Sequence, residues 1–203
     1  MKQKFSKPIF GDEDARHTGC PEVVGQHLAN QLSHFSSAIE LCCGVGITAI
    51  QLAKKMGRIT AVDINRKRIN DAKKNAKIYG VEDGIKFIVG DVLDCNLLKN
   101  LPADVAFLDP DWAAGGTGKS IRHVHVNSVD HTKPSMRKMY ILTKQYITPN
   151  IVIKVPKNFA FEALSDFGCC RLENIAYGGE VQFKLAYFLK DIMENNEAGF
   201  SFD

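Results

Sequence analysis

The chain lacks the cysteine spacing of a zinc protein and the long apolar runs of a membrane protein. Its six cysteines contain no C-x-x-C pair, the spacing from which structural zinc sites are usually built, so no metal is expected. No signal peptide and no run long enough to span a bilayer is visible. We therefore expect no membrane partner and free thiols in a reducing compartment, the cytoplasm or, in a eukaryote, the nucleus.

The chain also has little net charge, few tryptophans and no repeats. The 203 residues carry a net charge of only +3, which permits an anionic partner without requiring one. They include one tryptophan and no internal repeat. Because 45% of the residues are hydrophobic, the chain can bury the core of one domain. We expect an irregular N-terminal arm at residues 1–20, one domain at 21–193 and a flexible C-terminal tail at 194–203.

Short apolar runs alternate with segments of helical period along most of the chain. This alternation predicts an α/β fold, a Rossmann-like, doubly wound, mostly parallel seven-stranded sheet. Two final runs at 171–177 and 181–189 flank a Gly-Gly pair and predict an antiparallel C-terminal hairpin. The expected helices cover residues 21–35, 47–56, 65–79, 92–100, 135–146 and 158–167.

Four of the apolar runs each end in a carboxylate, at Glu40, Asp63, Asp91 and Asp109. In an open α/β sheet, ligands bind just outside the carboxyl ends of the strands. Four strands that end in this way would line one crevice with acidic hydrogen-bond acceptors. Such acceptors suit a ligand rich in hydroxyl and amino groups, and they repel a phosphate.

A Gly turn follows the first of these strands and leads into a helix. Gly44 and Gly46 let the backbone approach a ligand closely, although the full G-x-G-x-x-G spacing fails because position 49 is alanine. Asp63, at the end of the next strand, could accept both hydroxyls of a ribose, and its charge argues against NADP. Asp91 could accept from an adenine amino group. The alternative for both aspartates is a helix N-cap.

Several segments together carry a resemblance to a known family. The fourth motif, Asp109-Pro110-Asp111-Trp112, and the pattern of the C-terminal strand are the most specific of them. They resemble class I S-adenosylmethionine-dependent methyltransferases, and within these the trimethylguanosine synthase (RNA cap guanine-N2 methyltransferase) family. Residues 21–193 would then form the methyltransferase domain. The segments are 20–22, 40–46, 61–64, 75–81, 85–91, 106–112, 150–152 and 185–188.

The resemblance implies S-adenosyl-L-methionine as the cofactor. Glu40, Gly44 and Gly46 would contact its methionine part, Asp63 its ribose and Asp91 its adenine amino group. The same resemblance adds a few neighbours to the cofactor-binding set. These neighbours are Cys42, Ile64, Val92 and Asp109.

The resemblance also places Asp109 and Pro110 against the methyl-accepting amine, so 109–112 is the expected catalytic segment. An exocyclic amine is a poor nucleophile, because its lone pair is delocalised into the ring. Oxygen acceptors that bind its hydrogens would align the lone pair with the methyl group, and catalysis would be largely positioning. Trp112 would stack on a purine, with core packing as the alternative. The family pattern is Ser-Pro-Pro-Trp. Asp111, in place of the second proline, would pair with a cationic substrate, accept the released proton or face solvent.

The remaining substrate contacts are expected from a long loop and from the end of the fifth strand. Lys119 and Arg122 would touch RNA phosphates from the loop at 110–134, and Lys154 or Asn158 could reach the substrate from the strand. The loop sequence 113–120 matches a loose P-loop pattern. We reject this match, because no helical period follows it and the aspartates would crowd a phosphate.

Two further patterns leave alternatives open. His123, His125 and His131 could hold a metal, although solvated loop histidines or histidines near the substrate explain the pattern better. The helix at 65–79 carries a basic face that is either solvated or in contact with RNA. Cys42 and its neighbour Cys43 fit small packing residues better than nucleophiles.

The leading hypothesis is an S-adenosylmethionine-dependent N-methyltransferase that acts on an exocyclic amine, guanine N2 in a cap-like or other RNA. RNA is the expected partner, and the chain would act as a monomer or small oligomer. One alternative is an amine of a protein or a small molecule as the acceptor. Another is a cofactor-binding partner subunit without catalysis. An NAD-dependent dehydrogenase is disfavoured, because no Tyr-x-x-x-Lys or histidine dyad is present.

Overall fold

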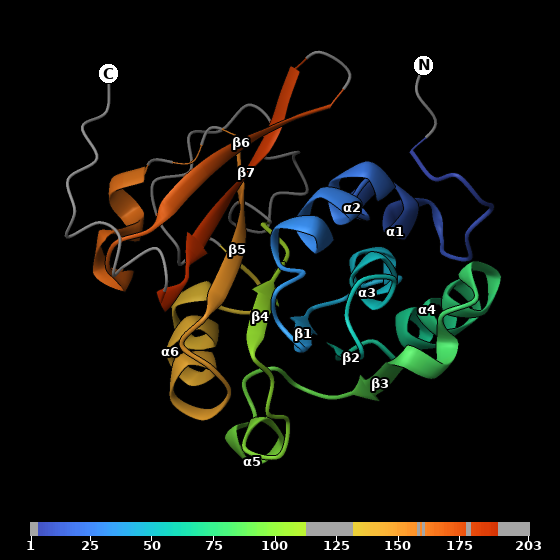
Figure 1. Ribbon diagram of the computed structural model, residues 1–203, viewed down its shortest axis with the longest axis horizontal. Helices are drawn as coiled ribbons and strands as arrows, with labels where there is room; N and C mark the ends of the chain where they lie inside the picture. The colour runs from blue at the N-terminus through green and yellow to red at the C-terminus, as the bar shows by residue number, and fades with distance from the viewer. Residues whose placement is uncertain (1–3, 113–131, 158, 160, 178–179, 191–203) are drawn as a thin grey trace.

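A computed structural model describes residues 4–112, 132–157, 159, 161–177 and 180–190. They form a seven-stranded sheet in the order β3-β2-β1-β4-β5-β7-β6 (Figure 1). The first five strands pair in parallel, and β7 is antiparallel to both β5 and β6. The predicted fold class is confirmed. The strands are β1 Ser37–Leu41, β2 Arg58–Asp63, β3 Ile85–Val89, β4 Val105–Leu108, β5 Ile151–Pro156, β6 Arg171–Tyr177 and β7 Glu180–Phe188.

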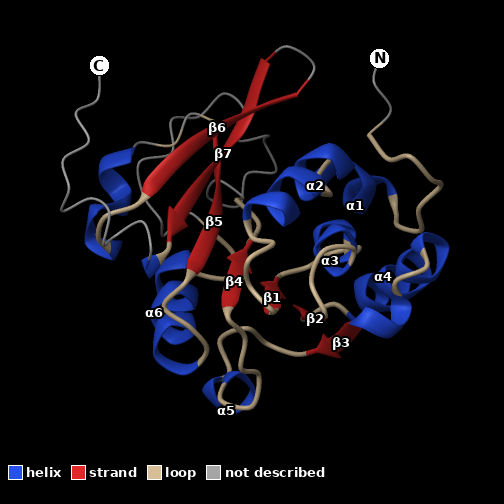
Figure 2. Cartoon of the chain, in the orientation of Figure 1, coloured by secondary structure: helices blue, strands red, loops and turns tan. Residues whose placement is uncertain are grey.

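Helices cover both faces of this sheet, as Figure 2 shows. The elements α2, α3 and α4 lie together on one side, and α5 and α6 lie on the other. No helix among the described residues is long and apolar enough to cross a membrane. The α-helices are α1 Glu13–Thr18, α2 Glu22–Gln31, α3 Ile47–Ala53, α4 Arg66–Tyr79, α5 Cys95–Leu98 and α6 Met136–Tyr146, and the 3-10 helices are η1 Glu82–Gly84 and η3 Phe161–Phe167.

The central strands are buried on both faces and divide the core into two clusters. Side chains alternate along a strand, so Ala38 packs beneath α2 and α3, whereas its neighbour Ile39 faces α6. On β4, Phe107 and Leu108 divide in the same way. Strands that are buried on both sides have an uninterrupted apolar sequence, and this explains why they could be located without structural information.

Four of the expected helices are shorter than predicted or of another kind, and one of them, expected at 47–56, ends at Ala53. The helix from residue 21 ends at Gln31, four residues early. The helix expected at 92–100 is a single turn whose N-cap is Asp94, which accepts a hydrogen bond from the backbone N–H of Asn96. The segment before β6 is the 3-10 helix η3. Element boundaries depend on such local caps and on packing, which periodicity alone does not specify.

The N-terminal arm was predicted to be irregular, and this prediction is wrong, because the arm contains the helix α1. Asp12 caps this helix by accepting from the backbone N–H of Ala15 at 2.9 Å. Asp14 lies in the first turn and Arg16 in the last turn, an order that complements the helix dipole. Ala15 is 4% exposed and belongs to the core cluster beneath α2. Tertiary packing therefore completes a helix that is too short to form alone.

Asn75 of α4 anchors the arm through a fully buried amide. Its Nδ2 donates to the backbone oxygens of Phe10 and Val45, both at 3.0 Å, and its Oδ1 accepts from the N–H of Phe10 at 2.7 Å. Every polar atom of this side chain is used within the protein. The arm is thereby tied both to α4 and to the Gly turn after β1.

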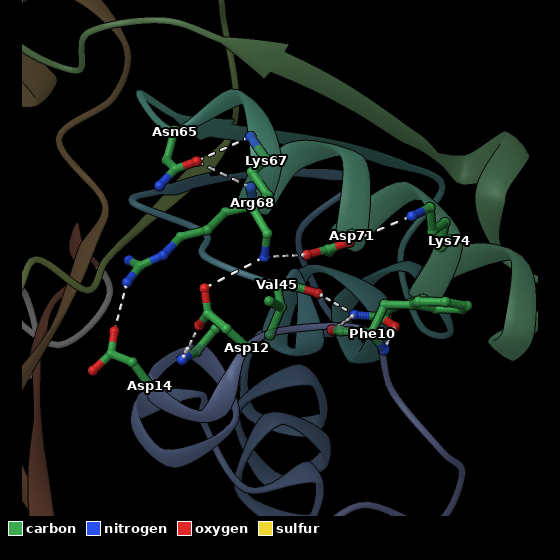
Figure 3. Close-up of polar contacts among 11 residues, drawn as sticks. Phe10, Asp12, Asp14, Val45, Asn65, Lys67, Arg68, Asp71 and Lys74 are labelled. Carbon is green, nitrogen blue, oxygen red and sulfur yellow. Dashed lines mark hydrogen bonds and ion pairs between the residues drawn. The ribbon is translucent and has the colours of Figure 1, made fainter.

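Part of the basic face of α4 binds the same arm. Arg68 pairs with Asp14 at 2.9 Å, and Lys67 lies 3.4 Å from Asp12 and 3.3 Å from Asp71 (Figure 3). These charges are therefore neutralised within the protein to a large extent. The solvated-face interpretation fits this arrangement better than an RNA-contacting patch does.

Candidate active-site cleft

A cleft of about 1260 Å³ opens where the five parallel strands β1 to β5 end. All four of the strand-ending carboxylates line it, namely Glu40, Asp63, Asp91 and Asp109. The structure thus brings these side chains to one edge of the sheet, as the sequence predicted. Val92 and exposed Ile64 line the same cleft.

The turn between β1 and α3 is built from residues with left-handed backbone conformations. Cys42 (φ 69°), Gly44 (φ 54°) and Gly46 (φ 80°) all lie in this region. A Cβ on Gly44 would meet no atom within 4 Å, and the residue lines the cleft. The open side of Gly44 thus leaves room for a ligand to approach the backbone.

Gly46 has a packing role that the sequence did not predict. A Cβ there would lie 2.9 Å from the Cβ of Ala72 on α4. Gly46 also does not belong to the residues that line the cleft. Glycine is required here so that α3 can begin close against α4, and a contact between Gly46 and a cofactor stays a prediction.

Asp63 ties the end of β2 to the Gly turn. Its Oδ2 accepts from the backbone N–H of Gly44 and its Oδ1 from that of Asn65, both at 2.8 Å. The cap alternative for Asp63 is wrong, because Asn65 is the N-cap of α4 and accepts from the N–H groups of Lys67 and Arg68. Each carboxylate oxygen keeps a second lone pair for a ligand hydroxyl.

Asp91 is exposed at the end of β3 and accepts from the backbone N–H of Leu93 at 2.8 Å. The cap alternative is wrong here too, because α5 is capped by Asp94. Ile64, which lines the same cleft as Asp63 and Asp91, is 70% exposed. An exposed large apolar side chain in a cleft with acceptors suits the face of a flat ring whose edges carry donors.

Glu40 is the most deeply buried of the four carboxylates, with 2% of its surface exposed. Burial, and secondarily the nearby Asp109 carboxylate, raise the pKa of Glu40 to about 8. Its Oε2 accepts from the backbone N–H of Ala49 at 2.7 Å. Glu40 is therefore a neutral acid near pH 7, able to donate one hydrogen bond as well as to accept.

The two cysteines of the turn are packing residues, as expected. Cys43 is buried in the core cluster beneath α3, and Cys42 packs partly against the cluster on the other face. Burial raises the pKa of both thiols. A protonated, buried thiol is a poor nucleophile.

Asp109 follows β4 directly and forms an ion pair that the sequence did not predict. Its Oδ2 accepts from Nζ of Lys154 at 2.7 Å, and both side chains are 16% exposed. Lys154 lines the cleft, so the expected contact with substrate stays a prediction, and its ammonium group binds Asp109. Asp109 is thus the only one of the four carboxylates that the described residues pair with a lysine.

Trp112 is largely buried and packs in the core, as the alternative predicted. The residue is 7% exposed, its Nε1 donates to the backbone oxygen of Lys154 at 3.0 Å, and its ring meets that of Phe159 edge-on at 5.3 Å. It also lines the cleft, and stacking on a purine stays a prediction. Asp111 is exposed, and its backbone forms an antiparallel bridge with Lys133.

The structure adds residues to the cleft that sequence reasoning missed. The N-terminal segment, with α1, forms one wall of the cleft. The only sequence signal for this wall was the Cys-Pro-Glu segment at 20–22. No sequence signal indicated Gln182 and Phe183 of β7. The N-terminal wall consists of Lys4, Asp14, Ala15, His17, Thr18, Gly19, Cys20 and Pro21.

Several predicted residues lie outside the described part of the chain. They are Lys119, Arg122, His123, His125, His131 and Asn158. Within the described ranges, no group of three or more His, Cys, Asp and Glu side chains is arranged to hold a metal ion.

Comparison with known proteins identifies the family. The family model for RNA cap guanine-N2 methyltransferases matches residues 35–192. The chain belongs to this family, and its fold is that of a methyltransferase. The chain is also 25% identical over 167 residues to trimethylguanosine synthase of Saccharomyces cerevisiae, a match that covers 79% of this chain and 52% of the synthase. The chain thus spans about half the length of this relative.

Solved structures share the fold at low sequence identity. A protein of Porphyromonas gingivalis W83 that is assigned as a methyltransferase superposes with a TM-score of 0.68 at 16% identity, covering 88% of this chain and 43% of that one. An O-methyltransferase from Bacillus cereus in complex with SAH has a TM-score of 0.57 at 14% identity, covering 83% of this chain and 81% of its own.

Proposed function

We propose that the protein is an S-adenosylmethionine-dependent N-methyltransferase whose acceptor is an exocyclic amine, with guanine N2 of RNA as the first candidate. The observation that carries this proposal is the division of the cleft. Three carboxylates and an open Gly turn follow the neighbouring strands β3, β2 and β1, and Asp109 and Trp112 follow the next strand, β4. Membership of the RNA cap guanine-N2 methyltransferase family supports the choice of acceptor.

The cofactor would lie along the first three strand ends. Gly44 leaves room for the methionine part, Asp63 has lone pairs for the ribose hydroxyls, and Ile64 offers an apolar surface to the adenine. Asp91 would accept from the adenine amino group. Bound in this way, S-adenosylmethionine would supply an electrophilic methyl group on its sulfonium, and the SAH complex of a protein with the same fold supports the choice of cofactor.

Catalysis would consist mainly of positioning the amine. Asp109 Oδ1 and the carbonyl oxygen of Pro110 would accept its hydrogens and leave the nitrogen lone pair directed at the methyl carbon. The nitrogen–carbon bond forms as the carbon–sulfur bond breaks, and the displaced proton passes to solvent. The part of Trp112 that lines the cleft would stack on the base.

The size of the cleft supports two ligands rather than one. Single small-molecule sites usually measure about 300–1,000 Å³, and this cleft reaches about 1260 Å³. Exposed Lys133 and Lys157 line the same cleft as Asp109 and would meet phosphates of an RNA chain.

Transfer of a labelled methyl group from S-adenosylmethionine tests the proposal. We expect label in total RNA from a cell lysate and in guanine N2 after digestion, and no label in the same lysate treated with RNase. Label that persists in protein or small molecules after RNase would indicate the alternative acceptors. Binding of the cofactor without transfer unless another chain is added would indicate a partner subunit.

A further inference from the structure

We propose that Lys154 is a positioning residue that orients both Asp109 and Trp112 toward the methyl acceptor, the first by its ammonium group and the second by its backbone carbonyl. This inference rests on the proposed function and deepens it. The sequence suggested that Lys154 meets the substrate, but the structure gives both of its polar groups partners in the catalytic segment.

The register of two neighbouring strands brings Lys154 and Asp109 together. β4 and β5 are parallel, with Leu108 opposite Ile153. The next residues along each strand, Asp109 and Lys154, therefore stand side by side and point to the same face. Their 2.7 Å contact is a charge-assisted hydrogen bond between two mostly buried groups.

The contact leaves one oxygen of Asp109 for the acceptor. Oδ2 is occupied by Lys154, and none of the described residues donates to Oδ1. A carboxylate without this lysine could rotate and present either oxygen. With Lys154 in place, Oδ1 of Asp109 points in one fixed direction, as an acceptor for a single amine hydrogen requires.

Lys154 remains charged although it is largely buried. Burial lowers its pKa, but Asp109 and the other acidic groups nearby outweigh burial, so that the pKa is raised overall. The ring of Phe183 on β7 lies 5.2 Å from its Nζ and adds a cation–π contact from the opposite side. The ammonium group is thus held between β4 and β7.

The two contacts of Lys154 can be separated by mutation. The bond to Trp112 uses the backbone oxygen and survives any change of side chain. Lys154→Met therefore removes the ammonium group, with its link to Asp109 and its contact with Phe183, and leaves the bond to Trp112 in place at similar side-chain volume. Lys154→Arg keeps a cation that can reach the same carboxylate, and exposed Lys55→Met is the matched control.

We expect Lys154→Met to lower kcat about 100-fold, with the KM for S-adenosylmethionine and the affinity for S-adenosylhomocysteine within about 3-fold of wild type. Lys154→Arg should restore kcat to within about 10-fold of wild type, and Lys55→Met should leave it unchanged. In an Asp109→Asn background, Lys154→Met should have little further effect, because the two residues act as one unit. The affinity for S-adenosylhomocysteine also shows that each variant is folded.

The outcomes separate this inference from the proposed function. If the wild-type protein transfers methyl groups and Lys154→Met does so at the same kcat, the inference is wrong and the proposed function stands. Equal losses in the Lys154→Met and Lys154→Arg variants would also contradict it, because the Arg variant keeps the charge. If the wild-type protein transfers no methyl group, the proposed function fails and the inference falls with it.

Discussion

The Asp63 carboxylate accepts a hydrogen bond from the backbone N–H of Gly44 at 2.8 Å, and this bond joins the end of β2 to the turn after β1. One residue thus shapes the Gly turn and lines the cleft that the turn borders. The expected ribose site is consequently formed by the fold before any ligand binds, which lowers the entropic cost of binding.

Asp63→Asn tests the ribose role, although the amide can keep only one of the two backbone hydrogen bonds that the carboxylate accepts. The amide keeps one acceptor oxygen but loses the charge, so hydrogen bonds to ribose hydroxyls weaken. We expect the wild-type protein to bind adenosine about 10-fold or more tightly than 2′,3′-dideoxyadenosine, and Asp63→Asn to lose most of this preference. Calorimetry measures both affinities. A preference that is unchanged in the variant would place the ribose elsewhere.

Glu40→Gln should make the stability of the protein less dependent on pH. The folded-state pKa of Glu40, about 8, lies above its ordinary value of 4.5. Its favourable contribution is therefore fully present below about pH 4.5 and is lost as the pH rises through 8. Between pH 5 and pH 9 we expect wild type to lose on the order of 3 kcal/mol relative to the variant.

Urea unfolding at several pH values measures this difference. The variant keeps an oxygen for the N–H of Ala49, so the local hydrogen bond is preserved. Glu82→Gln, at an exposed position, serves as the control and should follow the wild-type curve. Parallel pH curves for wild type and Glu40→Gln would contradict the assignment of Glu40 as a neutral acid.

Trp112→Phe and Trp112→Leu separate stacking from packing. Both variants lose the hydrogen bond to Lys154 and fill the buried site with an apolar side chain, but only Phe offers a ring. We expect both to bind S-adenosylhomocysteine, and turnover on RNA to fall about 10-fold or more further in the Leu variant, since stacking on a base contributes about 1–3 kcal/mol. Equal turnover in the two variants would mean that Trp112 packs in the core and does not stack on the base.

Asn75→Ala should release the N-terminal arm, whereas Arg68→Ala should not. Asn75 is fully buried and satisfies three backbone groups, so its loss should cost about 2–4 kcal/mol. The exposed pair of Arg68 and Asp14 should contribute less than about 1 kcal/mol. Urea unfolding gives the two free energies, and hydrogen exchange at residues 10–18 should accelerate strongly in Asn75→Ala only. A larger effect in Arg68→Ala would mean that charge, rather than the buried amide, holds the arm.

The sheet and its acidic edge could be predicted from sequence, because both depend on local patterns. The parallel strands carry short apolar runs, and those at the centre of the sheet are buried on both faces. Asp63 and Asp91 come directly after two of these runs, and the topology of the sheet then brings their side chains to one edge. The position of the cleft could therefore be predicted from the apolar runs and the carboxylates that follow them.

The pairing within the cleft could not be predicted, because it depends on which strands are neighbours and on how side chains pack. Lys154 and Asp109 meet only because β5 lies beside β4. Trp112 is buried because Phe159, far along the chain, packs against it. The helix α1 forms because the arm finds a partner in α4, and a six-residue segment has no detectable helical period of its own.

Titration of the wild-type protein with S-adenosylhomocysteine tests the central claim, that this cleft holds the cofactor, most directly. Calorimetry should show one molecule bound per chain, with an affinity that Asp63→Ala abolishes. Circular dichroism of the same samples establishes that both proteins are folded. Absence of binding by the folded wild-type protein at millimolar ligand would contradict the account.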